Sequence, residues 1–443
     1  MKIMVIGNGG REHAIVWTLA KSPSVSKIIC VPGNGGTSLE DKSVNFSATT
    51  ANDCLEIAQK EKCNMVVIGP ENPLAEGYAD LFLKNNIKVV GPVQNSAKLE
   101  SSKDFAKSFM KKYGVASAHS QTFTDLTSAK AYLKDHEIPV VIKADGLAAG
   151  KGVTVATTRE EAEKALESLM NGSLGEAGKS VVIEDYLSGT EVSILAAVSV
   201  TEESGANGKA RILPFLPARD HKRLYDGAKG PNTGGMGAVC PVDDFTPEIR
   251  EQFENTILRP TLNGLIAEKM DYRGFLFFGL MLTKDGPKCL EYNVRLGDPE
   301  TQAVLPLLKT DFANLCTSIC DGMLDTISLE WENGYQVAPV AVSGGYPAAY
   351  KKGIPIFFDN GLLHKSGAKV FVAGAISDRR SAKDVSPDAS GLITNGGRVL
   401  ACSAHGKTFT EAWENAYTAL NSVKFEGIFY RKDIGLPGAA EST

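Results

Sequence analysis

The sequence predicts a multidomain protein of mixed α/β and α+β class, built from three parts. First, residues 1–95 alternate short apolar runs with helical patterns, which is typical of a doubly wound parallel sheet. Second, residues 138–157 place a glycine-rich loop between two runs of strand character. Third, the apolar strands and single helix after residue 331 indicate a C-terminal α+β domain. The length of 443 residues is enough for roughly three domains with sizeable cores.

Composition excludes several classes of protein. Hydrophobic residues make up 43% and charged residues 22%, as in ordinary globular proteins. A net charge of −5 gives no reason to expect a nucleic-acid partner. The eight cysteines form no CxxC pair, so we expect reduced thiols and a cytoplasmic location. No signal-peptide pattern and no apolar run of about 18 residues is visible, so no membrane partner is expected.

The first 95 residues predict parallel strands joined by helices. Strands are expected at 2–7, 27–32, 65–70 and 88–92, and helices at 11–21, 52–62 and 74–86. Ligands of such sheets bind at the carboxyl ends of the strands. The loops expected there are 7–13 (GNGGREH), 32–37 (PGNGGT) and 69–74 (GPENPL).

The first loop does not fit a dinucleotide fingerprint. The third glycine position is Glu12, and the second strand ends in Val31-Pro32 without an acid for a ribose hydroxyl. The loop still opens a helix, and its glycines allow backbone N–H groups to approach an anion. We expect Gly9, Gly10 and Arg11 to bind a sugar phosphate or another small anionic ligand. The alternative is a tight turn required only by packing.

A helix is expected from about 96 to 113, with Lys103 near its start, and a glycine-rich loop at 145–152 follows it. The loop differs from Walker A in its glycine spacing and in the strand-like VTVAT after it. We expect a flap that closes over a triphosphate. The residues expected to contact the nucleotide there are Lys143, Gly150, Lys151 and Gly152. The alternative is a purely structural hairpin.

The strand at 180–187 opens into a turn at Ser188-Gly189. Such a hinge offers backbone groups to an adenine edge, beside apolar side chains. We expect this role for Glu184, Asp185, Tyr186 and Leu187, and a ribose contact for Glu191. A plain helix–strand linker would look the same.

Strands at 191–200 and 210–217 lead to a long polar segment, 220–237, which we expect to be a loop. Its cations Lys222 and Arg223 suggest an anionic substrate, because a loop this long in a compact domain is usually functional or disordered. The alternative is a mobile, solvated loop. A helix at about 247–270 should follow.

A hairpin turning at Asp285-Gly286 delivers the most informative strand, CLEYNV. Strand alternation places Glu291, Asn293 and Arg295 on one face and Leu290, Tyr292 and Val294 on the other. A carboxylate beside an amide oxygen suits Mg²⁺, and an arginine can clamp an anion. The alternative is the solvated face of an amphipathic strand. C-terminal strands are expected at 336–346, 368–374 and 398–404, and a helix at 409–422.

These stretches occur in the same order in one known family. The chain resembles the glycinamide ribonucleotide synthetases, also called phosphoribosylamine–glycine ligases, of the ATP-grasp superfamily. The resemblance covers nearly the whole chain. The matching stretches are GNGGREHA (7–14), PGNGGT (32–37), GPENPL (69–74), VIKADGLAAGKGV (141–153), DHKR (220–223), GPNTGGMGA (230–238), LEYNVRLGDPETQ (290–302), TNGGRVL (394–400) and YRKDIG (430–435).

The resemblance implies a domain organisation and an activity. The expected parts are a preATP-grasp domain at 1–101, an ATP-grasp domain at 102–330 with a flap subdomain at 115–189, a C-terminal α+β domain at 331–433 and a tail at 434–443. The implied reaction joins glycine to 5-phosphoribosylamine through glycyl phosphate, with ATP and Mg²⁺ or Mn²⁺, in purine synthesis. In eukaryotic relatives this domain is often fused to later enzymes, so the chain is compatible with one module of a larger purine-pathway polypeptide.

Site roles follow residue by residue. Glu291 and Asn293 match the family's metal ligands, Lys103 and Lys143 its ATP-phosphate lysines, 184–187 its adenine hinge and Glu191 its ribose contact. Catalytic roles are expected for Arg295, Lys143, Asp220 and Lys222. Substrate contacts are expected from Gly9, Gly10, Arg11, Lys222, Arg223, Asn232, Thr233 and Arg295. The strand 279–284 lacks the acid that many ATP-grasp enzymes use as a further metal ligand. Another ATP-grasp ligase and a catalytically silent nucleotide-binding protein remain alternatives.

Overall fold

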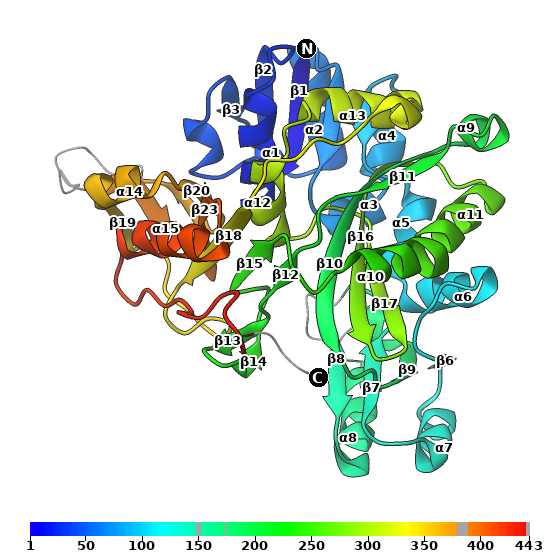
Figure 1. Cartoon of the computed structure of the whole chain (residues 1–443). Coiled ribbons are helices and arrows are strands. Elements are labelled where there is room, and N and C mark those ends of the chain that lie inside the picture. The colour runs from blue at the N-terminus through cyan, green and yellow to red at the C-terminus, as the bar shows by residue number, and fades with distance from the viewer. Residues whose placement is uncertain (148–151, 173–174, 379–388, 440–443) are drawn as a thin grey trace.

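A computed structural model describes residues 1–147, 152–172, 175–378 and 389–439. The N-terminal unit, at the top of Figure 1, is a parallel sheet in the order β3-β2-β1-β4-β5. Its strands are β1 (Lys2–Gly7), β2 (Lys27–Pro32), β3 (Ser43–Asn45), β4 (Met65–Ile68) and β5 (Lys88–Val90). Its helices are α1 (Gly10–Ala20), α2 (Ala51–Glu61), α3 (Glu71–Ala75) and α4 (Tyr78–Lys84). The predicted doubly wound sheet is confirmed.

The strand β1 shows why this sheet takes helices on both faces. Ile3 and Val5 pack with buried residues of α1, whereas Met4 and Ile6 pack with those of α2 and α4. Both sets of side chains are buried, as expected for a continuous apolar run. The helix expected at 74–86 is instead split into α3 and α4, because Gly77 adopts a φ of +81° between them.

The next helical stretch is also divided. The structure has α5 (Gln94–Ser101) and α6 (Lys103–Tyr113), where one helix was expected. Ser102 is extended, and its side chain accepts a hydrogen bond from the backbone N–H of Phe105, so it caps α6. Lys103 therefore lies in the first turn of a new helix.

The flap unit, at the bottom of Figure 1, is an antiparallel sheet in the order β6-β9-β7-β8. Its strands are β6 (Ser120–Phe123), β7 (Val140–Ala144), β8 (Val153–Ala156) and β9 (Val181–Asp185). The helices α7 (Leu126–Asp135) and α8 (Arg159–Met170) pack on this sheet around a core of their own. That core is separate from the two that fill the rest of the chain.

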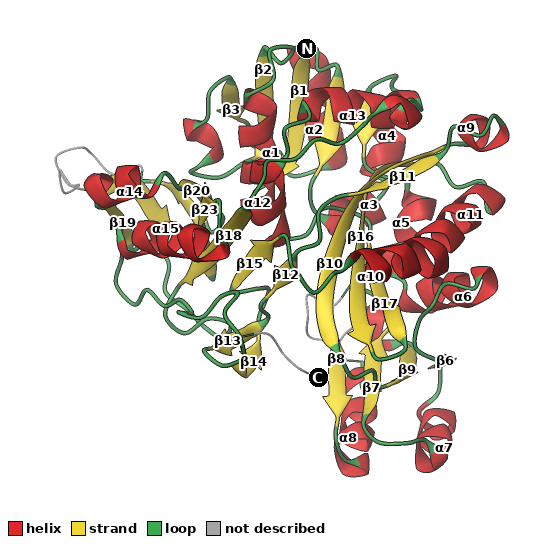
Figure 2. Cartoon of the chain, in the orientation of Figure 1, coloured by secondary structure: helices red, strands yellow, loops and turns green. Residues whose placement is uncertain are grey.

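The central sheet has the order β11-β10-β16-β17 and is antiparallel throughout. Its strands are β10 (Thr190–Val200), β11 (Arg211–Pro214), β16 (Tyr272–Thr283) and β17 (Gly286–Asn293). Figure 2 shows the long pair β10 and β16 running between the N-terminal unit and the flap. The helices of this part are α9 (Glu202–Ala206), α10 (Pro247–Phe253), a π-helical turn at Glu254–Leu258, α11 (Arg259–Ala267), α12 (Glu300–Val304) and α13 (Phe312–Asp321).

The segment 219–240 is ordered structure rather than the expected loop. It contains β12 (Arg219–Asp220), a hairpin of β13 (Arg223–Tyr225) and β14 (Lys229–Asn232), and β15 (Gly237–Cys240). β12 and β15 join a sheet in the order β12-β15-β18-β23-β20. The central region and the C-terminal region thus share one sheet, which holds this segment in place.

The C-terminal strands of that sheet are β18 (Tyr335–Val342), β20 (Lys369–Val372) and β23 (Arg398–Gly406). A second sheet contains β19 (Pro355–Phe358), β21 (Ala375–Ser377), β22 (Ala389–Thr394) and β24 (Val423–Lys424). The helices α14 (Asn360–Ser366) and α15 (Phe409–Asn421) lie with these sheets at the left of Figure 1. The predicted α+β character is confirmed, although the second sheet and α14 were not foreseen.

Within the described residues, helices are too short or too polar to span a lipid bilayer. All eight cysteines have free thiols.

Candidate nucleotide and metal site

The strand β17 carries the predicted metal ligands at its end. Opposite Gly279 and Leu280 of β16, β17 has one extra residue, Leu290, between the paired residues Glu291 and Cys289. This β-bulge shifts the alternation: Cys289 and Tyr292 are buried, whereas Leu290 is partly exposed. The prediction that Leu290 shares the apolar face of Tyr292 and Val294 is therefore wrong. The bulge also brings the Leu290 carbonyl to 3.4 Å from Lys143 Nζ.

The charges around Glu291 suit a cation-binding carboxylate. Burial by itself raises the pKa of Glu291, but Lys222, Lys143, Lys103 and Arg295 together hold it below its usual value, so the group is ionised. Asn293 Oδ1 lies on the same face and accepts a hydrogen bond of 3.4 Å from Arg295. The described residues contain no cluster of three His, Cys, Asp or Glu side chains suited to a metal. One carboxylate and one amide oxygen fit Mg²⁺, which takes its other ligands from water and phosphates.

Lys143 lies on β7 and reaches the same place from the flap. Its Nζ is 3.0 Å from each carboxylate oxygen of Glu184. Glu184 itself is buried, so its side chain is available to these partners rather than to solvent. A second lysine, Lys107 of α6, lies 2.9 Å from Glu184 Oε2. We did not predict Lys107. The signal was its position four residues after Lys103, on the same helix face.

The first end of the flap loop is fixed at α6, and its far end pairs with β7. Lys103 Nζ donates to the carbonyl of Gly146 at 3.0 Å, and the Asp104 N–H donates to Asp145 Oδ1 at 3.2 Å. The Ala144 N–H donates to the carbonyl of Gly152 at 2.7 Å. The predicted nucleotide contacts Gly150 and Lys151 lie outside the described residues.

The predicted adenine hinge leaves β9 at Asp185. The Asp185 side chain pairs with His136 at 3.0 Å, and its backbone N–H donates to the carbonyl of His119. Tyr186 and Leu187 are half-buried in the loop that leads to β10. Their backbone therefore lies in the loop that joins the flap to the central sheet, and its contact with adenine stays a prediction.

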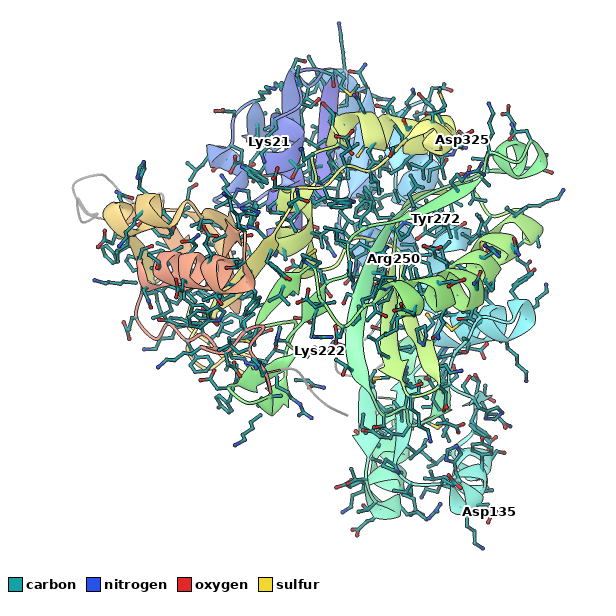
Figure 3. All side chains as sticks on the ribbon, in the orientation of Figure 1. Lys21, Asp135, Lys222, Arg250, Tyr272 and Asp325 are labelled. Atoms are coloured by element: carbon teal, nitrogen blue, oxygen red, sulfur yellow. The ribbon has the colours of Figure 1, made fainter. Side chains whose placement is uncertain are left out.

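Glu191 on β10 pairs with Lys222, which follows β12. Lys222 belongs to the segment 219–240, which joins the central sheet to the C-terminal unit. Figure 3 shows Lys222 on the side of this segment that is near the central sheet. Burial by itself lowers the pKa of Lys222, but Glu191 and Glu291 outweigh it and hold the pKa above its usual value. The ammonium group is thus a fixed positive charge near both carboxylates.

Asp220 has one carboxylate oxygen without a hydrogen-bond partner among the described residues. Its Oδ1 is buried and has no hydrogen-bond partner within the described part of the chain. Burial and the charge of Glu300 raise the pKa of Asp220 well above its usual value, against the opposing effects of Lys222 and Arg398. Glu300 is itself buried and accepts a hydrogen bond of 2.9 Å from Ser193.

The remaining predicted residues of this segment stabilise its shape. Thr233 donates to the carbonyl of Lys222 through its hydroxyl at 2.7 Å and through its N–H at 2.8 Å. Arg223 donates to the carbonyl of Gly230 at 2.8 Å across the β13–β14 hairpin. Asn232 is exposed at the end of β14. Thr233 thereby holds the backbone that carries Lys222.

The Arg295 guanidinium group is surrounded by protein carboxylates. Its Nε lies 3.3 Å from Glu71 and its Nη2 lies 3.1 Å from Glu100. Its Nη1 donates to the carbonyl of Leu296 at 3.3 Å. Burial by itself lowers the pKa of Arg295, but Glu100 and Glu71 raise it above its usual value. Glu71 belongs to the GPENPL stretch, so this loop does reach the site, through a residue that we did not predict.

The first glycine loop is closely packed. The Gly9 N–H donates to Glu12 at 2.6 Å, and a Cβ at Gly10 would lie 2.4 Å from Gln302. The buried Arg11 side chain pairs with Glu12 at 2.6 Å and donates to the carbonyl of Leu296 at 2.9 Å. The Arg11 guanidinium group thus points into the protein, and packing alone accounts for glycine at Gly9 and Gly10.

Arg398 is a further residue that sequence reasoning missed. It follows the glycines of the TNGGRVL stretch and donates to the carbonyls of Gly234 and Asp298. Asp298 and other nearby acids raise its pKa above the usual value, against the effect of burial. Gly234 and Asp298 both belong to stretches that carry the resemblance to the family. Their shared membership could have identified Arg398 from the sequence.

Comparison with known proteins supports one family over the whole chain. Three family models match: "Phosphoribosylglycinamide synthetase, N domain" at 1–100, its "ATP-grasp (A) domain" at 101–301 and its "C domain" at 336–437. A phosphoribosylamine–glycine ligase of Clostridium acetobutylicum is 46% identical over 436 residues, covering 98% of this chain and 99% of that protein. One of Neisseria meningitidis is 44% identical, covering 98% of each.

Solved structures agree. The crystal structure of a phosphoribosylamine–glycine ligase from Thermotoga maritima has a TM-score of 0.82 at 35% identity and covers 98% of this chain and 100% of that chain. A biotin carboxylase domain from Hydrogenobacter thermophilus, in complex with MgADP, has a TM-score of 0.70 at 17% identity, covering 97% of this chain and 91% of that one. The second likeness concerns the fold alone.

Proposed function

Because the chain belongs to the phosphoribosylglycinamide synthetase family, we propose that it is an ATP-dependent ligase that joins glycine to 5-phosphoribosylamine. The products are glycinamide ribonucleotide, ADP and phosphate, in de novo purine synthesis. One observation carries the proposal: Glu291 lies on β17 among four cations, Lys222, Lys143, Lys103 and Arg295, drawn from four separate parts of the chain. This arrangement suits a metal–triphosphate complex beside an acceptor.

The reaction has two steps. A carboxylate oxygen of glycine attacks the γ-phosphorus of ATP, and ADP leaves with the electron pair of the broken P–O bond. The amine of phosphoribosylamine then attacks the carbonyl carbon of glycyl phosphate, and phosphate leaves as the amine loses a proton. No enzyme nucleophile takes part, so the protein supplies positions and charges.

The proposed roles of the residues carry over from the resemblance to the family. Lys143, Lys103 and the flap residues Gly150, Lys151 and Gly152 would hold the phosphates, residues 184–187 the adenine and Glu191 the ribose. Glu291 and Asn293 would hold Mg²⁺ or Mn²⁺, which neutralises phosphate charge when bound. Lys222 and Arg295 would balance the negative charge that develops on the transferred phosphoryl group. Asp220 is the third residue proposed to take part in catalysis there. The phosphoribosylamine side would be shaped by Gly9, Gly10, Arg11, Arg223, Asn232 and Thr233.

The test is ADP release with ATP, Mg²⁺, glycine and freshly made phosphoribosylamine, with each omitted in turn. We expect ADP formation to require all four. ADP formation without glycine or phosphoribosylamine would favour a different ATP-grasp ligase, and ADP absent under every combination would favour a silent nucleotide-binding protein. The proposed partners are small molecules in a cytoplasmic setting.

A further inference from the structure

One buried carboxylate, that of Glu184, is shared by two lysine side chains. Lys107 Nζ lies 2.9 Å from Oε2, and Lys143 Nζ lies 3.0 Å from each oxygen. Only 6%, 8% and 2% of the side chains of Lys107, Lys143 and Glu184 are exposed. The three residues come from α6, β7 and β9, so they meet only in the folded chain.

The two lysines differ in their other contacts. Lys143 also donates to the carbonyl of Leu290, beside the candidate metal ligand Glu291. Lys107 Nζ is buried, and its ion pair with Glu184 is the contact that the structure shows for it. Burial lowers the pKa of Lys107, Glu184 opposes that shift and Lys143 adds to it. Within the described part of the chain, Lys107 is thus paired with Glu184 alone.

The charges of Lys107, Lys143 and Glu184 suggest a role for Lys107. Two ammonium groups and one carboxylate leave a buried excess of one positive charge, which an incoming phosphate can neutralise. If Lys143 were the only partner, turning it towards a phosphate would leave Glu184 charged and unpaired in the interior. An unpaired buried charge is strongly unfavourable. With Lys107 present, Glu184 keeps a partner while Lys143 moves.

We propose that Lys107 is a positioning residue that holds Glu184, so that Lys143 is free to bind the phosphates of a nucleoside triphosphate. The inference rests on the proposed function, because that function assigns the phosphates to Lys143. It adds a residue that contacts neither substrate nor metal.

The test is calorimetric titration of the full chain with MgATP. Lys107→Met should weaken ATP binding by at least about tenfold. The Michaelis constant for ATP should rise by a similar factor, while kcat at saturating ATP stays within about twofold and the constant for glycine is unchanged. Lys107→Arg should restore binding, because a guanidinium group keeps the charge on Glu184. Lys111→Met, at an exposed position one turn along α6, is the matched control and should bind as the wild type does.

A double variant separates this role from a purely structural one. In Glu184→Gln the carboxylate charge is absent, so the further change Lys107→Met should have little effect on ATP binding. Wild-type affinity in Lys107→Met, or an equal loss in both backgrounds, would overturn the proposal. If Lys107→Met does not fold, Lys107→Gln is compared in the same two backgrounds. Wild-type chain that binds ATP without forming ADP would contradict the proposed function and leave this binding test intact.

Discussion

Arg295 and Glu100 join the segment just after β17 to the last turn of α5. Arg295 Nη2 lies 3.1 Å from Glu100 Oε1, and the other carboxylate oxygen accepts the Val294 N–H at 2.7 Å. One buried carboxylate therefore holds both a side chain and the backbone just beyond Asn293. Burial raises the pKa of Glu100, against the effect of Arg295.

Replacing Arg295 should reduce turnover. Arg295→Ala removes a positive charge beside Asn293 and leaves Glu71 and Glu100 without their partner, so kcat should fall by at least about tenfold. Arg295→Lys should restore little of the lost kcat, because an ammonium group cannot span two carboxylates as a guanidinium group does. Steady-state kinetics are the measurement. The exposed Arg259, changed to Ala, is the control, and near-wild-type kinetics for Arg295→Ala would exclude this role.

Replacing Glu291 should raise the metal requirement. Glu291→Gln keeps the shape of the side chain but removes the charge that cations on several elements hold in its ionised form. The Mg²⁺ concentration for half-maximal activity should rise at least about tenfold, since a charged ligand binds a cation more strongly than an amide does. Electron paramagnetic resonance of Mn²⁺ binding checks the same loss without turnover. Glu414→Gln, exposed on α15, should leave both readouts unchanged.

Adding one methyl group at Gly235 should disturb Asp220. Gly235 has a φ of +111°, and a Cβ there would lie 2.4 Å from Pro299 and 2.5 Å from Asp220 Oδ1. Gly235→Ala should therefore lower activity by at least about tenfold and also lower the melting temperature. Gly208→Ala shares a positive φ, +73°, but meets nothing within 4 Å. Equal losses of activity in the two variants would show that backbone strain, and not contact with Asp220, causes the effect.

His221 should make stability depend on pH. Its Nδ1–H faces the carbonyl of Gly237 at 3.2 Å, and its Nε2 accepts the Gly435 N–H at 3.0 Å, so the buried ring is neutral. Burial lowers its pKa to about 3. Between that value and the ordinary 6.5, the unfolded chain binds the proton and the folded chain does not. The contribution of His221 to the free energy of unfolding is therefore complete above about pH 6.5. It falls with decreasing pH, by about 2 kcal/mol at pH 5.

Urea unfolding at pH 7 and pH 5 measures this dependence. His221→Gln should be less stable than the wild type at pH 7 but should lose less stability on acidification, because the titrating group is gone. His405, which is exposed at the end of β23, provides the control variant His405→Gln. An unchanged acid dependence in His221→Gln would contradict the assignment.

Local pattern predicted much of the fold. The strands β1, β2, β4, β5, β10, β16, β17, β18, β20 and β23 and the helices α1, α2 and α15 lie close to where apolar periodicity placed them. Some of the errors occurred where one residue changes the pattern. Gly77 divides a helix, Ser102 caps a new one, and Leu290 forms a bulge that reverses the alternation.

The sequence by itself determined the family, the order of the elements and the stretches that carry the chemistry, because turn glycines and strand alternation are local properties. Only the tertiary structure decided which charges meet. Lys107 and Glu184 form an ion pair although they are 77 positions apart in the sequence. Arg295 likewise pairs with Glu71 and Glu100 of the N-terminal region. Such pairs leave no periodic signal, since their attraction depends on distance in space and on burial, and both arise only when the separate sheets pack together.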